Sequence, residues 1–185
     1  MATTQQRQAA RSTQRGITLV ELAVVLALIA IIVGIALPSY AAAIERQRLR
    51  GVADELEFDT RWARGAAQAA GRPLRLTVQS NAAATCYVVH SGDRDDCDCL
   101  SGAGTTSCQG GAQAFKTVYL PSSAPIHLKT NNRSMQFEPR RGVVTPTASI
   151  EVVTRHGDSI RKIVAITGRV RSCSPSGSVS GVPAC

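Results

Sequence analysis

A run of 21 residues from Ile17 to Leu37 contains a single ionisable side chain, the carboxyl group of Glu21. At about 1.5 Å of rise per residue, a helix of this length spans roughly 30 Å, the thickness of the hydrocarbon core of a bilayer. Three arginines precede the run, Arg7, Arg11 and Arg15, and no acidic residue stands among them. Because positive charge before a single apolar helix keeps the N-terminus in the cytoplasm, we expect the run to cross a membrane once.

Two simpler interpretations explain the apolar run less well. A secretory signal peptide has a shorter apolar region followed by a small-residue cleavage site, and no such site follows here before the charged stretch that begins at Glu45. A plain signal anchor fits the length of the run but does not explain Glu21. A carboxylate inside a bilayer costs about 3 kcal/mol, so such a residue usually has a partner or a function.

The stretch GITLVE at residues 16–21 resembles the cleavage site of type IV prepilins. In that family a dedicated peptidase cuts after the glycine and the new N-terminus is methylated, which implies cleavage after Gly16 and methylation of Ile17. The glutamate at the fifth mature position of the family corresponds to Glu21. The resemblance implies that this carboxylate neutralises the terminal amine of a neighbouring subunit as a filament grows. Pro38 also matches the family, in which a proline kinks or locally melts the long helix.

This resemblance divides the chain into four segments. Residues 1–16 form a leader that is removed, and residues 17–37 form the transmembrane and filament-core half of a helix. Residues 38–71 form the amphipathic half, and residues 72–185 form a periplasmic β-rich domain with a C-terminal tail. Removal of the leader leaves 169 of the 185 residues and lowers the net charge from +8 to +5, because three arginines are lost. The last segment is long enough for one modest core.

The spacing of apolar residues beyond Pro38 predicts that the helix continues to about Ala70. The apolar positions recur every three or four residues, and they include Leu49, Val52, Leu56, Ala63 and Ala67. Short β-type runs follow at residues 74–78, 86–90, 114–120, 126–130, 135–138, 149–154 and 160–166. Residues 91–111 are rich in Gly, Ser, Thr and Asp and indicate a loop or an insertion. We therefore predict an α+β, type IV pilin-like fold, in which a long N-terminal helix packs on an antiparallel β-sheet domain.

Six cysteines all follow the apolar run, and they are Cys86, Cys97, Cys99, Cys108, Cys173 and Cys185. An even number in an exported domain indicates disulfides formed in an oxidising periplasm. Sequence alone does not fix the pairing. We favour Cys173 with Cys185, which bracket the C-terminal tail, and this leaves the other four to staple the insertion at residues 86–108.

The acidic run at residues 93–98 suggests calcium, which prefers carboxylate oxygens. Its spacing matches no EF-hand loop, and a disulfide-stapled acidic loop explains it more simply. Cys97 and Cys99 lie too close together for a usual zinc site, and periplasmic thiols oxidise. The three histidines have no credible nucleophile beside them, so we expect no enzyme activity, no metal and no cofactor.

Basic residues concentrate near the C-terminus. From Lys129 to Arg171 the chain has nine basic and three acidic residues, a net charge of +6. The basic residues are Lys129, Arg133, Arg140, Arg141, Arg155, Arg161, Lys162, Arg169 and Arg171. If the strand at residues 160–166 continues, alternation places Arg169 and Arg171 on one side, about 6–7 Å apart, which suits adjacent phosphates of a nucleic acid. The alternative is a solvated basic face, or one that contacts neighbouring subunits or anionic lipid.

The stretch IVAITGRVR at residues 163–171 resembles the minor pilins of the FimT and GspH family. FimT-type pilins are implicated in DNA binding through a G-R-x-R motif, which residues 168–171 match. The implied DNA-binding residues are Gly168, Arg169 and Arg171, with Lys162, Arg161, Arg155, Arg140 and Arg141 as neighbouring cations. The tail at residues 172–185 is a candidate for a constrained loop that presents these arginines.

The resemblance implies a minor pilin that captures double-stranded DNA without sequence preference for uptake in natural transformation. Its other implied partners are major and minor pilins, the prepilin peptidase and, before assembly, the inner membrane. The domain would face the periplasm and then the cell surface on a filament. The alternative is a structural minor pilin, or a GspH-like pseudopilin of type II secretion, that initiates or caps a filament without binding DNA.

Overall fold

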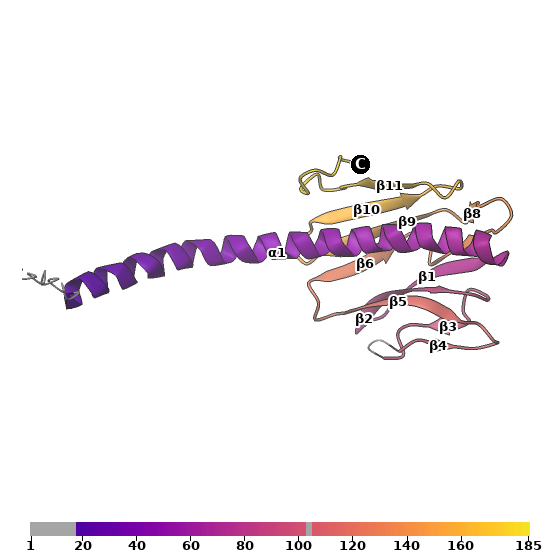
Figure 1. Cartoon of the computed structure of the whole chain (residues 1–185), viewed down its shortest axis with the longest axis horizontal. Coiled ribbons are helices and arrows are strands. Elements are labelled where there is room, and N and C mark those ends of the chain that lie inside the picture. Colours follow the sequence, from indigo (N-terminus) through magenta and orange to yellow (C-terminus); the bar gives the residue numbers. More distant parts are fainter. Residues whose placement is uncertain (1–17, 103–104) are drawn as a thin grey trace, which may run out of the picture. The chain divides into compact units, whose positions relative to one another are not determined.

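The computed structural model describes residues 18–102 and 105–185, and the chain divides between Ala41 and Ala42 into two compact units. The expectations for Gly16 and Ile17 lie outside the described residues. One helix, α1 (Leu19–Ala70), belongs to both units (Figure 1). The fold is α+β, with a long N-terminal helix and antiparallel sheets, which confirms the predicted class.

The first unit contains the apolar part of α1. Among the described residues, α1 is one helix with a window long and apolar enough to cross a membrane, and none of that window is buried. Thr18 caps the helix, because its Oγ1 accepts a hydrogen bond of 3.2 Å from the backbone N–H of Glu21. Of the kink or local melting that the resemblance implies at Pro38, local melting is not found, because helix α1 continues through this residue.

The second unit is built from the amphipathic part of α1 and two antiparallel sheets. The five-stranded sheet has the order β5-β2-β1-β7-β8, and the four-stranded sheet has the order β11-β10-β9-β6. The strands of the first sheet are β1 (Leu74–Ser80), β2 (Ala84–His90), β5 (Ala114–Pro121), β7 (Ser134–Phe137) and β8 (Val144–Thr145). The strands of the second are β6 (Ile126–Thr130), β9 (Ala148–Thr154), β10 (Ser159–Val164) and β11 (Val170–Cys173).

One hydrophobic core joins α1 to both sheets. The helix contributes fully buried side chains at the predicted spacing, among them Leu49, Leu56 and Ala63. The five-stranded sheet adds Phe137 and the four-stranded sheet adds Ile150 to the same core. Burial of such a stripe along a helix is worth roughly 25 cal/mol for each Å² of apolar surface, so this packing holds the helix against the strands. Both sheets are thereby fixed to one helix face.

A small two-stranded sheet, β3 (Cys97–Asp98) with β4 (Ser107–Cys108), lies in the segment that we expected to be a loop or an insertion. Disulfides link Cys86 to Cys99 and Cys97 to Cys108, so four cysteines staple this insertion. Strands of two residues have no readable periodicity, which is why the sequence pattern did not reveal them. Within residues 18–102 and 105–185, no three His, Cys, Asp or Glu side chains form a group suited to a metal ion.

Candidate functional site

The Gly168–Arg171 segment begins with a tight turn between two antiparallel strands. After β10 the chain reverses, and the N–H of Gly168 donates to the carbonyl of Ala165 at 2.8 Å. Gly168 has a φ of 75°, which favours glycine over every other residue. The strand at 160–166 does not continue into the motif, since Arg171 lies on β11, which runs back beside β10.

Arg169 and Arg171 nevertheless share one face. Val170 between them is buried in the core, whereas both arginines are exposed. Arg171 lies opposite Ile163 of β10, a residue that also points away from the core. The alternation of a strand thus directs the two guanidinium groups to the outer face of the four-stranded sheet.

Arg161 also belongs to this outer face, but its charge is compensated. Its Nη2 donates to Oε2 of Glu151 on the neighbouring strand at 3.0 Å. Burial acts to raise the pKa of Glu151, but hydrogen bonds from Ser159 and Arg161 and the charge of Arg161 lower it overall. Lys129 lies opposite Glu151 on β6 and is exposed. Arg161 is therefore a weaker candidate for a phosphate contact than Arg169 or Arg171.

Lys162 does not belong to the exposed face that carries Arg169 and Arg171. It occupies the opposite face of β10 and is only 3% exposed. Its Nζ lies 2.7 Å from Oε2 of Glu57 and 3.3 Å from Oδ1 of Asp54, both on α1, and 2.9 Å from Oγ of Ser172. Strand parity explains the error, because adjacent residues of a strand face opposite sides and one of them has to face the helix.

Arg155 lies away from Arg169 in the fold. It belongs to the turn between β9 and β10, whereas Arg169 follows the turn at the other end of β10. Its guanidinium donates to the backbone carbonyls of Ser122 and Ser123. The structure therefore does not group Arg155 with the motif.

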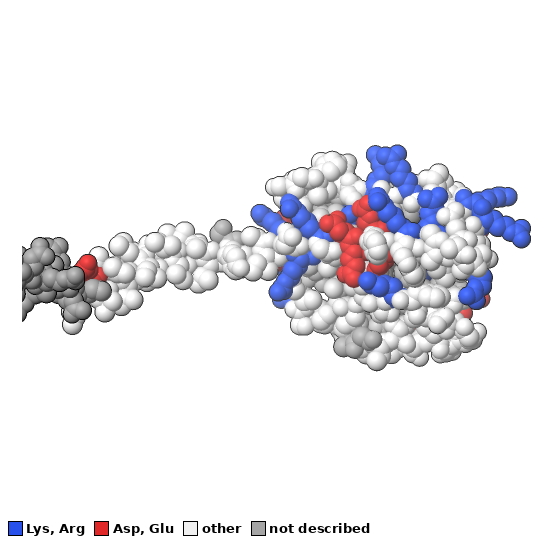
Figure 2. Space-filling view, in the orientation of Figure 1, with Lys and Arg blue, Asp and Glu red and all other residues white. Residues whose placement is uncertain are grey.

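Arg140 and Arg141 are brought close to the motif by the backbone. Both are exposed in a turn after β7 that the N–H of Gly142 closes on the carbonyl of Glu138 at 3.0 Å. The N–H of Val144 then donates to the carbonyl of Ile166 at 2.8 Å. This bond ties β8, which follows residues 138–142, to residues 165–169. We call residues 138–142 and residues 165–169 the two basic turns. Figure 2 shows basic side chains at the end of the second unit where α1 ends, and others at its opposite end.

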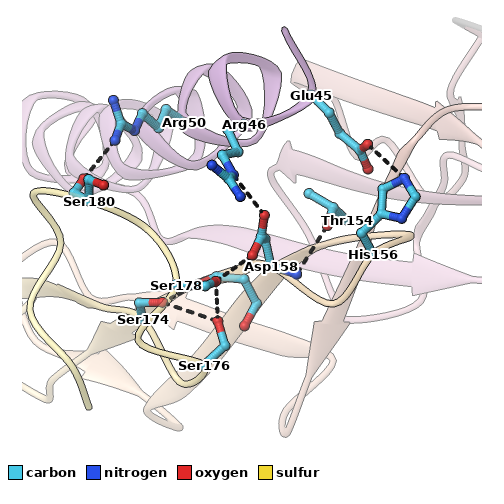
Figure 3. Close-up of polar contacts among 11 residues, drawn as sticks. Glu45, Arg46, Arg50, Thr154, His156, Asp158, Ser174, Ser176, Ser178 and Ser180 are labelled. Atoms are coloured by element: carbon cyan, nitrogen blue, oxygen red, sulfur yellow. Dashed lines mark hydrogen bonds and ion pairs between the residues drawn. The ribbon is translucent and has the colours of Figure 1, made fainter. Parts of the chain in front are cut away.

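The C-terminal tail does not present the arginines. Cys173 is bonded to Cys185, the pairing favoured from the sequence, and the loop between them folds onto α1. Figure 3 shows the contacts: Arg50 Nη2 donates to the carbonyl of Ser180 at 2.6 Å, and Arg46 Nε lies 3.1 Å from Oδ2 of Asp158. Ser178 donates to the other oxygen of Asp158. Asp158 thus ties the tail to the helix, and Val179 is buried in the core.

The structure also shows residues that the sequence pattern did not single out. Arg64 of α1 donates its Nε–H to the carbonyl of Gly142 at 2.8 Å and so reaches the two basic turns. Trp62 on α1 and Phe115 on β5 are partly exposed, with ring centroids 6.3 Å apart. No local signal identifies these residues, because their partners are distant in the sequence.

This chain is similar to one known family over its N-terminal segment and to one known structure over most of its length. Residues 11–37 match the family model of the prokaryotic N-terminal methylation motif. The crystal structure of the type IV minor pilin FimU from Pseudomonas aeruginosa strain PAO1 is similar at 13% identity and a TM-score of 0.49, covering 69% of this chain and 89% of that one. The search of curated proteins gave no match. The methylation motif includes Gly16, Ile17 and Glu21.

Proposed function

We propose that this chain is a minor subunit of a type IV pilus. Residues 17–37 anchor it in the inner membrane with the second unit in the periplasm, and the prepilin peptidase removes residues 1–16. The processed helix then becomes part of a filament core with other pilins. The match of residues 11–37 to the methylation motif supports this proposal, as do the long exposed apolar helix and three disulfides typical of an oxidising compartment.

We further propose that the subunit binds double-stranded DNA without sequence preference, for uptake in natural transformation. The observation that carries this proposal is the exposed group Arg169, Arg171, Arg140 and Arg141. In the described part of the chain, none of these four guanidinium groups has a carboxylate within 4.0 Å. Uncompensated guanidiniums bind phosphates, and this attraction is the main sequence-independent source of DNA affinity.

The first prediction concerns the arginine pair of the motif. The full chain in a non-ionic detergent should bind a duplex of mixed sequence, with an affinity that falls steeply as salt increases. Replacing both Arg169 and Arg171 with Gln removes two phosphate contacts, so the slope of log affinity against log salt should fall by about 2. Fluorescence anisotropy at several salt concentrations measures both quantities.

The matched control replaces Arg48 and Arg155 with Gln. It removes the same charge from exposed positions outside the two basic turns. We expect this control to keep most of the wild-type slope. Equal losses in both double variants would show that binding is spread over the whole surface, and a wild-type chain that binds no duplex at low salt would exclude the DNA proposal.

A second candidate function keeps the fold and the assembly but has no DNA partner. In it the subunit initiates or caps a filament of a pilus or of a type II secretion system. Exposed aromatic side chains favour it, because Phe58 and Trp62 on α1 are 64% and 40% exposed and large exposed apolar groups suit contacts with a neighbouring subunit. The duplex titration above separates the two functions.

A further inference from the structure

Arg64 lies against both basic turns at their glycines. A Cβ added to Gly168 would lie 2.6 Å from Cδ and from Nε of Arg64. A Cβ added to Gly142 would lie 3.2 Å from Nη2 of Arg64 and 2.6 Å from Nε2 of Gln68. A Cβ at Gly168 would force Arg64 to shift, and a Cβ at Gly142 would force Gln68 to shift and would crowd Arg64. Arg64 therefore fills the space beside Gly168 and shares the space beside Gly142 with Gln68.

The two glycines are also the points where the turns adopt their special backbone. Gly142 has a φ of 62° and Gly168 a φ of 75°, a region that other residues rarely adopt. Arg140 and Arg141 directly precede the first glycine, and Arg169 directly follows the second. A contact that fixes the glycines therefore fixes the exit direction of the exposed arginines.

Arg64 makes this contact with both its polar and its apolar atoms. Its Nε–H donates to the carbonyl of Gly142 at 2.8 Å across 78 residues of sequence, while its Cδ packs on Gly168. The side chain is partly buried, and Ala63 beside it is fully buried in the core. The guanidinium is thus anchored on a rigid helix and linked to two separate turns.

We infer that Arg64 is a positioning residue, which holds the two basic turns at a fixed spacing so that Arg140, Arg141 and Arg169 meet one nucleic-acid backbone together. This inference rests on the proposed DNA binding and names a residue outside the G-R-x-R motif on which that binding depends. Cations that are already in place lose less conformational entropy on binding than cations on independent mobile turns.

The first experiment separates position from charge at residue 64. Arg64→Met removes charge and hydrogen bond, whereas Arg64→Lys keeps the charge but loses the planar Nε–H donor. We expect both variants to bind a mixed-sequence duplex about tenfold more weakly than the wild-type full chain in non-ionic detergent. Arg61→Met, which removes an exposed arginine one turn earlier on α1, should stay within about twofold. Wild-type affinity of Arg64→Lys would overturn the inference, because charge alone would then suffice.

A second comparison separates positioning from direct contact with phosphate. If Arg64 acts through the turns, Arg64→Met should have no further effect on affinity in a chain whose Arg140, Arg141 and Arg169 are already Gln. A tenfold loss that persists in this background would show that Arg64 itself binds the phosphate, and would overturn the inference.

A third measurement does not depend on DNA. Hydrogen exchange at the amides of Gly142, Val144 and Gly168 should become faster in Arg64→Met, since the turns lose their common anchor. The fluorescence of Trp62, the single tryptophan of the chain, should stay unchanged if α1 remains packed. Unchanged exchange would overturn the inference while leaving the DNA proposal intact. Faster exchange in a chain that binds no duplex would instead show that the contact exists and that the proposed function fails.

Gly168→Ala provides a test from the opposite side of the contact, and Gly157→Ala is its control. Gly157 also has a positive φ, of 91°, but nothing lies within 4 Å of its added Cβ. Both variants strain the backbone, and Gly168→Ala in addition displaces Arg64. We expect a several-fold loss of duplex affinity in Gly168→Ala and none in Gly157→Ala. Equal affinities of these two variants would contradict the inference.

Discussion

At the residue scale, strand parity decides which basic side chains reach solvent. Lys162 and Arg161 are adjacent in the sequence, yet Lys162 is buried against α1 and Arg161 lies on the outer face. Burial acts to raise the pKa of Glu57, but the hydrogen bond and charge of Lys162, with Arg61 and Ser172, lower it overall. Lys162 is therefore a structural cation that links β10 to the helix.

This role predicts that Lys162→Met destabilises the fold without changing DNA affinity. The variant leaves Glu57 without its main partner, so we expect a loss of about 1–3 kcal/mol in the free energy of unfolding. Arg161→Met removes a more exposed pair and should cost about 1 kcal/mol or less. Chemical denaturation measures both losses. If Lys162→Met lost as much duplex affinity as Arg171→Gln, Lys162 would contribute to DNA binding and this structural role would be wrong.

At the element scale, the C-terminal tail is a disulfide-closed loop that contacts α1, and the carboxylate of Asp158 is one of the groups that hold it there. Asp158 accepts a hydrogen bond from Ser178 of the tail and another from Arg46 of the helix, as Figure 3 shows. The hydrogen bond from Ser178 lowers the pKa of Asp158 most, burial opposes this shift, and Arg46 and the nearby His156 lower the pKa further. The ionised form of Asp158 is therefore the form that the docked tail stabilises.

The docking of the tail should consequently depend on pH. Because the folded pKa lies below its ordinary value of 3.8, the contribution is fully present above that value and is lost as pH falls through the folded pKa. We expect the protection factor of the Val182 amide, which donates to Val179, to fall as pH is lowered from 3.8 through the folded pKa of Asp158. In Asp158→Asn the protection should be lower at pH 5 and change little with acid. Constant protection in the wild-type chain would refute this role of Asp158.

At the scale of the whole molecule, one helix runs through two units that differ in how exposed its apolar side chains are. The apolar side chains that the structure describes in the first unit are exposed, whereas the second unit buries the stripe that begins at Leu49 against both sheets. Glu21 is the only ionisable residue in the run from Ile17 to Leu37 and stands in the first turn of α1. A carboxylate there is tolerated in a membrane only with a partner, and we propose that the partner is the terminal amine of a neighbouring subunit.

Glu21→Val should therefore leave cleavage after Gly16 intact and impair incorporation into filaments. Removing the carboxylate makes the membrane-embedded chain more apolar, so membrane insertion should not suffer. The measurement is the ratio of processed subunit in sheared filaments to that in membranes, with Glu21→Asp as a control that keeps the charge. Normal incorporation of Glu21→Val into filaments would contradict the proposed role of Glu21 in assembly.

Periodic and local features could be predicted from the sequence. The helix end near Ala70 followed from the spacing of the apolar residues, and most longer strands followed from alternation. The shared face of Arg169 and Arg171 followed from the same period of two. These features depend on a few neighbouring residues, so a local pattern contains them.

The sequence by itself determined the membrane-length helix, the α+β class and the even set of cysteines, because composition and spacing express them directly. Only the tertiary structure decided that β11 turns back beside β10, that Lys162 faces the helix and that the tail folds away from the motif. It also decided that Arg64 meets Gly142 and Gly168. These facts depend on which distant segments pack together, and that choice is made by the whole core rather than by any stretch of neighbouring residues.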